Sequence, residues 1–273
     1  MSPDETMALS GSADGRLRLW NIKEGRVVGD PLDKDAVQCL DWSPNGLEIA
    51  SGSMDGTVRR WNPDTGQQIG STMETDSWVS AIKYSPQSDK IASGAVDGII
   101  RVWSKDGKLL IEIKGHDHSV NSLYWSKDGA HIFSGSSDGM IRKWQLTDGL
   151  KEVFVFRGHT YTVESVCVSP DERHLVSASA DNSIRIWDLE TNQQVGDPLL
   201  HDDGLWTFVL SSDGRFIASA GSDKKIDIWS LEAALKQAGD QVRVRIAIFS
   251  AYSLIGFVLW QCTARREAQG KSS

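Results

Sequence analysis

The feature that most constrains the fold is a set of tryptophans that recur at an almost constant interval. Six of the eleven Trp residues lie 41 to 43 residues apart, and each follows an Asp by six positions and a Ser by ten. The six triples are Ser10-Asp14-Trp20, Ser51-Asp55-Trp61, Ser93-Asp97-Trp103, Ser134-Asp138-Trp144, Ser177-Asp181-Trp187 and Ser219-Asp223-Trp229. A chain that repeats one phrase in a fixed register repeats one structural unit.

Each repeat divides into four short apolar stretches separated by turn residues such as Asp-Gly. In the fourth repeat the predicted strands cover Val120–Trp125, His131–Ser136, Met140–Trp144 and Glu152–Phe156. Strands this short do not hold together alone, so the units must stack around a common axis. The spacing therefore predicts an all-β fold, a β-propeller of four-stranded blades with six repeats evident, closed as six blades or left as an incomplete seven-bladed ring.

These residues resemble the WD-repeat family over roughly residues 7–230. In that family a buried hydrogen-bonded tetrad joins a His in the loop before a blade to a Ser or Thr, a turn Asp and a strand Trp. The resemblance implies three full tetrads here, which are His116, Ser134, Asp138, Trp144; His159, Ser177, Asp181, Trp187; and His201, Ser219, Asp223, Trp229. Such a chain stiffens a blade because a buried indole N–H and a buried carboxylate both need partners.

The earlier repeats depart from the family pattern. The His position holds Asp33 in the second repeat and Thr75 in the third, and the first repeat lacks its opening strand. The Trp-Asp pair occurs only at Trp187-Asp188, so the resemblance depends on the register of the repeats. The phrase Gly-Asp-Pro-Leu, at 29–32 and 196–199, is similar to linkers of fungal WD-repeat proteins, some of which carry a nucleotide-binding signalling domain upstream.

The C-terminal residues allow three interpretations. We place the propeller at residues 1–238 and a tail at 239–273, in which alternating apolar residues predict a strand at 242–250. We expect this strand to supply the one missing from the first blade and so remove an exposed sheet edge. The alternatives are a truncated or wrongly joined end and a membrane anchor over Ile246–Thr263, which is uncharged and precedes Arg265 and Arg266. About thirteen apolar residues beyond a strand are too few to span a bilayer, so the anchor is the weakest interpretation.

Composition limits the partners and the compartment. The net charge of −8 disfavours binding to a phosphate backbone, so no nucleic-acid partner is expected. Cys39, Cys167 and Cys262 are far apart and odd in number, which is typical of reduced thiols in an intracellular protein, cytoplasmic or nuclear. The N-terminus has neither the basic start nor the apolar stretch of a signal peptide.

The recurring Ser, His and Asp also raise the possibility of a hydrolase triad. A catalytic triad occurs once, with its Ser open to substrate, whereas here the trio recurs with a Trp at the blade period. His116 and His118 have no third ligand near them in sequence, so no metal site is predicted. No phosphate-binding glycine loop is present, and no cofactor is expected.

The loops before each first strand and the turns between second and third strands are expected to form a binding face. Propellers of the resembled family present these segments together. The predicted partner-binding residues are Met54, Trp78, Val96, His118, Ser137, Tyr161 and Ala180. Large aromatic and soft apolar side chains in exposed loops are enriched at binding hot spots.

The sequence therefore predicts a non-enzymatic scaffold that binds other proteins or peptides on this loop face. Two alternatives remain open: a fragment of a larger signalling protein without activity of its own, and a hydrolase that uses one Ser-His-Asp set.

Overall fold

The computed structural model describes residues 1–12, 14–28, 36–147, 149–236 and 243–247. The chain divides into two compact units, Met1–Val155 and Phe156–Ser273. Nearly all of the described secondary structure is β, and it forms six antiparallel sheets. None of the described helices has the length and apolar character needed to cross a membrane.

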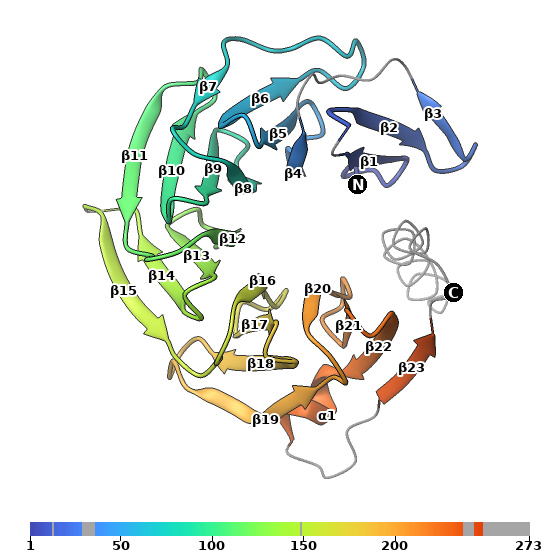
Figure 1. The fold of residues 1–273 in the computed structure, drawn as a ribbon, viewed down its shortest axis with the longest axis vertical. Helices are drawn as coiled ribbons and strands as arrows, with labels where there is room; N and C mark the ends of the chain where they lie inside the picture. Colours follow the sequence, from blue (N-terminus) through green and yellow to red (C-terminus); the bar gives the residue numbers. More distant parts are fainter. Residues whose placement is uncertain (13, 29–35, 148, 237–242, 248–273) are drawn as a thin grey trace. The chain divides into compact units, whose positions relative to one another are not determined.

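Each sheet is one blade, in which consecutive strands pair with one another (Figure 1). The predicted β-propeller blades are confirmed. The first unit contains blade 1, β1 (Met7–Gly11), β2 (Leu17–Asn21) and β3 (Arg26–Val28); blade 2, β4 (Val37–Trp42), β5 (Ile49–Ser53), β6 (Thr57–Trp61) and β7 (Met73–Glu74); blade 3, β8 (Val79–Tyr84), β9 (Lys90–Ala95), β10 (Ile99–Ser104) and β11 (Leu109–Lys114); and nearly all of blade 4, β12 (Val120–Trp125), β13 (His131–Ser136), β14 (Ile141–Gln145) and β15 (Lys151–Phe156).

The second unit contains the two remaining blades and the only described helix. Its elements are blade 5, β16 (Val163–Val168), β17 (His174–Ser179), β18 (Ser183–Asp188) and β19 (Gln194–Leu200); and blade 6, β20 (Leu205–Leu210), β21 (Phe216–Gly221), β22 (Lys225–Ser230), α1 (Leu231–Leu235) and β23 (Arg243–Ala247). The helix begins at Leu231, and the side chain of Ser230 before it caps the helix by accepting a hydrogen bond from the N–H of Ala233.

The hydrophobic core lies between neighbouring blades of each unit. Between blades 2 and 3, for example, Met73, Val79 and Ile91 pack together with Trp103 at 5 % exposure or less. In the second unit, Leu199 and Leu205 pack between blades 5 and 6 with Trp229. Blades bury their faces against one another, which explains why short strands are stable in this arrangement.

The turn between the second and third strands follows one design. In blade 3 the Asp97 carboxylate accepts the N–H of Ile99, which is an Asx turn. Gly98 has a φ of 77°, and a Cβ there would lie 2.3 Å from the carbonyl oxygen of His116. The Asp-Gly phrase thus holds the turn tightly against the loop that enters the next blade.

The strand predicted at residues 242–250 is present as β23, but its predicted partner is wrong. β23 pairs with β22, so it is the fourth strand of blade 6 and not the missing strand of the first blade. Among the described residues, blade 1 has three strands. The alternation of apolar residues correctly indicated a strand, but it does not determine which sheet edge the strand joins. Residues 248–273, which include most of the proposed anchor and Cys262, lie outside the described residues, as do Asp33 and the linker at 29–32.

Candidate functional site

The four residues of the predicted tetrad in blade 4 form one hydrogen-bonded chain. The indole Nε1 of Trp144 donates to Ser134 Oγ at 2.8 Å, and the same oxygen lies 2.7 Å from His116 Nε2. His116 Nδ1 lies 2.8 Å from Asp138 Oδ2. The loop before β12 brings His116 to β13 and β14, and Gly115 leaves room for the Trp144 ring, which would lie 2.2 Å from a Cβ at that position.

Blade 5 repeats this geometry closely. Trp187 donates to Ser177 Oγ at 2.9 Å, which lies 2.8 Å from His159 Nε2, and His159 Nδ1 lies 2.9 Å from Asp181. The hydroxyl of Ser183 donates to the same carboxylate at 2.6 Å. Both tetrads are therefore satisfied buried networks, which make a sheet rigid.

Burial and hydrogen bonding shift the titration of these groups in opposite directions. Burial raises the pKa of Asp138, but the hydrogen bond and charge of His116, together with Met140 N–H and Arg142, hold it at about 2. The pKa of Asp181 is shifted in the same direction, because the bonds from His159 and Ser183 outweigh its burial. Burial lowers the pKa of His159 against the opposing effect of Asp181. The blade 5 network therefore favours an ionised Asp181 beside a neutral His159.

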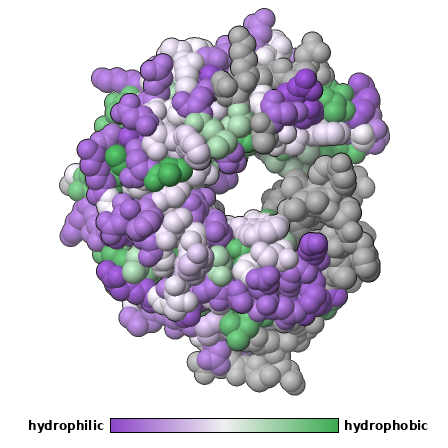
Figure 2. All heavy atoms as spheres, in the orientation of Figure 1, coloured by the Kyte–Doolittle hydropathy of each residue, from purple (hydrophilic) through white to green (hydrophobic). Residues whose placement is uncertain are grey.

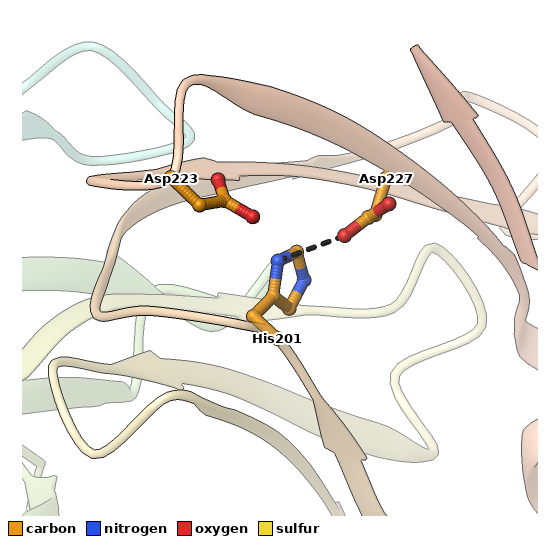
Figure 3. Close-up of side chains that lie close together, drawn as sticks. All are labelled: His201, Asp223 and Asp227. Atoms are coloured by element: carbon orange, nitrogen blue, oxygen red, sulfur yellow. Dashed lines mark ion pairs between the residues drawn. The ribbon is translucent and has the colours of Figure 1, made fainter. Parts of the chain in front are cut away.

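Blade 6 contains the third tetrad with a different carboxylate. Trp229 donates to Ser219 Oγ at 3.1 Å, and Ser219 Oγ lies 2.8 Å from His201 Nε2, as predicted. His201 Nδ1, however, forms no hydrogen bond among the described residues; it lies 3.0 Å from Asp227 Oδ2, on β22, as an ion-pair contact (Figure 3). The predicted partner Asp223 instead accepts the N–H of Lys225, and its Oδ2 is buried without a hydrogen-bond partner. Asp227 thus replaces Asp223 as the carboxylate paired with the imidazole, by an ion-pair contact in place of a hydrogen bond.

A charge inversion accounts for the change of partner. In the other five blades the residue four positions after the turn Asp is an Arg, namely Arg18, Arg59, Arg101, Arg142 and Arg185. In blade 3 that Arg101 contacts Asp97 at 3.0 Å and Glu112 of the fourth strand at 3.3 Å. In blade 6 this position is Asp227, and the cation comes from the fourth strand, where Arg245 Nε contacts Asp227 at 2.9 Å. The pairs Arg101–Glu112 and Asp227–Arg245 occupy equivalent register positions.

The family comparison agrees with this repeated architecture. The family model "WD domain, G-beta repeat" matches six times, at residues 1–21, 28–62, 66–104, 107–145, 150–188 and 198–230. The chain belongs to the WD-repeat family. No curated protein matches the chain.

One WD-repeat blade shows what replaces the missing histidine. Thr75 occupies the His position before blade 3 and is buried. Its hydroxyl lies 2.8 Å from the carbonyl oxygen of Gly56 and 2.6 Å from that of Ser77, so it bonds to the loop backbone. The pair Trp103–Ser93 is retained at 2.9 Å. Blade 3 therefore keeps the indole–hydroxyl bond without the imidazole.

The Ser-His-Asp sets of the WD-repeat blades are arranged as buried structural networks. Ser134, Ser177 and Ser219 have no exposed surface, and each already accepts an indole N–H. A nucleophilic serine needs an open approach for the substrate carbonyl and a hydroxyl that faces it. Neither condition holds at these three positions.

The cluster in Figure 3 is the one described group whose donor atoms could hold a metal ion. One ligand atom each from His201, Asp223 and Asp227 lies within 4.8 Å of the others. Arg245, however, already contacts both oxygens of Asp227, at 2.9 and 3.3 Å, and also pairs with Asp202. A guanidinium in this position supplies the positive charge that a cation would bring. The arrangement is that of a salt-bridge network.

In blades 2 to 6 the predicted binding loops lie together at one end of the blade. Backbone hydrogen bonds of 2.9 to 3.1 Å join the residue before each turn Asp to the loop that starts the same blade, in the pairs Met54–Ala36, Val96–Trp78, Ser137–Ser119, Ala180–Thr162 and Ser222–Gly204. In the first unit, Trp78 is 54 % exposed, Val96 is 46 % exposed and His118 is exposed, whereas Met54 and Ser137 are half-buried. In the second unit, Tyr161 is 65 % exposed and Ala180 is half-buried.

One exposed aromatic residue of the second unit, Trp206, was not among the binding residues predicted from the sequence. Trp206 is 54 % exposed at the second position of β20. The equivalent positions of the other first strands are polar, namely Gln38, Ser80, Asn121 and Glu164. That departure within the repeat was visible in the sequence. In the view of Figure 2 hydrophilic residues predominate, and hydrophobic residues form small separate groups.

Proposed function

We propose that this chain is a non-enzymatic protein-interaction module whose loop face holds a peptide or a domain of a partner. WD-repeat propellers generally mediate protein–protein interactions. The observation that carries the proposal is the pair Trp78 and Val96, two exposed apolar side chains on loops joined by a backbone hydrogen bond. Aromatic side chains held on a rigid scaffold lose little entropy on binding, so they are effective anchors.

Charge around this pair defines the kind of partner. Glu74 at the end of β7, Asp76 on the loop of Trp78 and Asp117 on the loop before β12 are exposed. The second unit has Asp203 exposed in the equivalent loop, close in sequence to Trp206. Carboxylates that surround an apolar anchor attract cationic groups and repel anionic ones. We infer that the partner presents an apolar side chain flanked by Lys or Arg.

The test compares two double variants of the purified chain used as bait. Trp78→Ala/Val96→Ala removes the proposed anchor, and Leu109→Ala/Leu110→Ala removes a similar exposed apolar area on β11 (42 % and 45 % exposed). Loss of a hot-spot anchor costs about 2 kcal/mol or more, which is roughly a 30-fold loss of affinity. Partners captured by the wild type should remain with the β11 variant and disappear with the Trp78 variant.

Two controls separate binding from folding. The melting temperatures of the two variants should agree with the wild type, because both remove exposed side chains. Captured partners should elute with rising salt, since the contacts include exposed charges. Equal capture by both variants would refute the proposed face, and a lowered melting temperature for the Trp78 variant alone would assign Trp78 to the core.

A further inference from the structure

Two neighbouring strands of the second unit carry a carboxylate without a partner and an exposed indole. Glu164 is the second residue of β16 and is half-buried. Burial raises the pKa of its carboxyl group, and among the described residues no hydrogen bond or cation counteracts this effect. A half-buried carboxylate that gains nothing from a partner costs the folded chain stability. A ligand that brings a positive charge would supply the missing partner.

The equivalent position of blade 4 shows why Glu164 has no partner. There Asn121 Nδ2 donates to Ser137 Oγ, on the turn between the second and third strands, at 3.0 Å. The ladders of blades 4 and 5 have the same register and the same bulge at this position. Glu164 therefore lies beside Ala180, the equivalent of Ser137. Blade 5 thus lacks the hydroxyl that a polar side chain at this position would bond.

The next blade brings Trp206 to the same place. β16 and β20 lie side by side in the second unit (Figure 1). A Cβ on Gly204, two residues before Trp206, would lie 3.3 Å from the carbonyl oxygen of Ala180. The segment that carries the indole therefore packs against the residue beside Glu164. The carboxylate and the indole come from adjoining segments at the loop-face end of blades 5 and 6.

Blade 3 shows that a side chain at this position reaches the next blade. The Ser80 hydroxyl donates to the carbonyl oxygen of Val120, the first residue of β12, at 2.7 Å. The same relation places the longer Glu164 side chain at the start of β20, where Leu205 is buried and Trp206 is 54 % exposed. A carboxylate beside an indole attracts an organic cation, by an ion pair and by a cation–π contact.

The neighbouring cations of blade 6 are already paired. Lys225 and Arg245 both contact Asp202, in the loop before β20, at 2.5 Å each. The next residue, Asp203, is exposed, and its carboxylate accepts the N–H of Gly204 at 2.8 Å. Asp203 therefore adds negative charge beside Trp206, and these two cations do not neutralise it.

We propose that Glu164 and Trp206 form a binding site for a Lys or Arg side chain of the partner protein. The Glu164 carboxylate pairs with the cation, and the Trp206 ring packs against it. This inference rests on the proposed function, because it identifies where the loop face binds a cationic residue of the partner. Trp78 and Val96 of the first unit bind the apolar residue.

The experiment titrates the full chain with two capped tripeptides, acetyl-Gly-Lys-Gly-amide and acetyl-Gly-norleucine-Gly-amide. Both have an aliphatic side chain, but only the first is charged. Isothermal titration calorimetry should show binding about tenfold weaker for the norleucine peptide. In a chain labelled with 5-fluorotryptophan, the lysine peptide should shift the fluorine signal that is absent from Trp206→Phe. Equal affinities, or an unshifted Trp206 signal, would overturn the proposal.

Substitutions test the two side chains separately. Glu164→Gln should weaken binding of the lysine peptide about tenfold, and the melting temperature should not fall, because a half-buried charge without a partner is removed. Glu190→Gln removes an exposed carboxylate from the turn between β18 and β19 and should bind like the wild type. Trp206→Leu should weaken binding about threefold or more. Equal weakening by Glu164→Gln and Glu190→Gln, or a lowered melting temperature for Glu164→Gln, would contradict the proposed site.

Two further variants separate this site from the proposed face and from the chain's own cations. Trp78→Ala/Val96→Ala should bind the lysine peptide like the wild type. Loss of partner capture by that variant without any binding of the lysine peptide would overturn this inference alone, and the reverse result would overturn the proposed face alone. Arg265→Ala/Arg266→Ala should bind with unchanged affinity. A gain of about tenfold would overturn the proposal, because the chain's own arginines would then occupy the site.

Discussion

Blades 4 and 6 hold the same indole, hydroxyl and imidazole but obtain their carboxylate from different places. In blade 4 it is the turn residue Asp138, and the third-strand cation Arg142 contacts Glu152 of the fourth strand. In blade 6 it is the third-strand residue Asp227, and the cation Arg245 is on the fourth strand. Moving the cation from one strand to its neighbour preserves the ion pair and reverses its direction. β23 therefore stabilises blade 6 electrostatically. Without Arg245 of β23, Asp227 would be a buried charge without a cation.

The largest expected difference in stability is between variants of the two turn aspartates, Asp138 in blade 4 and Asp223 in blade 6. Asp138→Asn in blade 4 should lower the free energy of unfolding by about 2–4 kcal/mol, since it weakens a buried network with His116. Asp227→Asn in blade 6 should cost a similar amount. Asp223→Asn, with a buried oxygen that has no hydrogen-bond partner, should change stability by less than about 1 kcal/mol. Urea unfolding of the three variants measures this, and a large loss in Asp223→Asn alone would restore the family pattern to blade 6.

A smaller loss of stability is expected when Arg245, the cation that pairs with Asp227, is replaced. Arg245→Ala should destabilise by about 1–2 kcal/mol, because its side chain is 31 % exposed and solvent screens part of the interaction. The amides of β22 that pair with β23 should exchange faster. Exchange in blade 4 should not change, which makes its amides the internal control. Uniform acceleration in both blades would mean that the effect is global rather than local to β23.

The smallest expected changes in stability come from the titration of His201 and Asp138 with pH. Burial lowers the folded-state pKa of His201 below 6.5, so the folded chain disfavours its proton. That contribution to stability is fully present above about pH 6.5 and is lost as the pH falls through the lowered folded-state pKa. Asp138, with a folded-state pKa of about 2, contributes stability that is present above its ordinary pKa of 3.8 and is lost between about pH 4 and 2.

Thermal unfolding at a series of pH values tests this order. The wild type should lose stability first below about pH 6.5, and His201→Gln should reduce this loss, leaving the part that comes from His159 and the loss below about pH 4. A wild-type curve that is level down to pH 4 would contradict the proposed neutral imidazole in blade 6.

The periodic sequence predicted the blades and two of the tetrads because each position depends only on local register. Ser134, Asp138 and Trp144 lie within eleven residues of one chain segment, and the loop before the blade brings His116 to them. The carboxylate of blade 6 could not be assigned this way. Which carboxylate pairs with His201 depends on Arg245. Arg245 contacts Asp227 only when β23 pairs with β22. The one sequence signal was an Asp at 227 where five repeats have Arg.

The same reason explains why the pairing of β23 was predicted wrongly. Alternation at 242–250 indicates a strand with one buried face, and it fits the outer edge of blade 6 as well as the edge of β1 that no described strand covers. The choice depends on the charge of Asp227, which faces Arg245 across the ladder, and of Asp202, which contacts Arg245 from the loop before β20. Charge complementarity between strands is visible only once the register is known.

A charge-swap cycle tests the reversed ion pair of blade 6. Asp227→Arg alone should place two cations together, and Arg245→Glu alone should add an anion beside Asp227 and Asp202, so each should destabilise the chain by about 3 kcal/mol or more. The double variant Asp227→Arg/Arg245→Glu reproduces the arrangement of blade 4, with Asp223 able to take His201. Its free energy of unfolding should recover most of the loss, as a favourable coupling in the double-mutant cycle. A double variant as unstable as the sum of the two single changes would contradict the reversed pair.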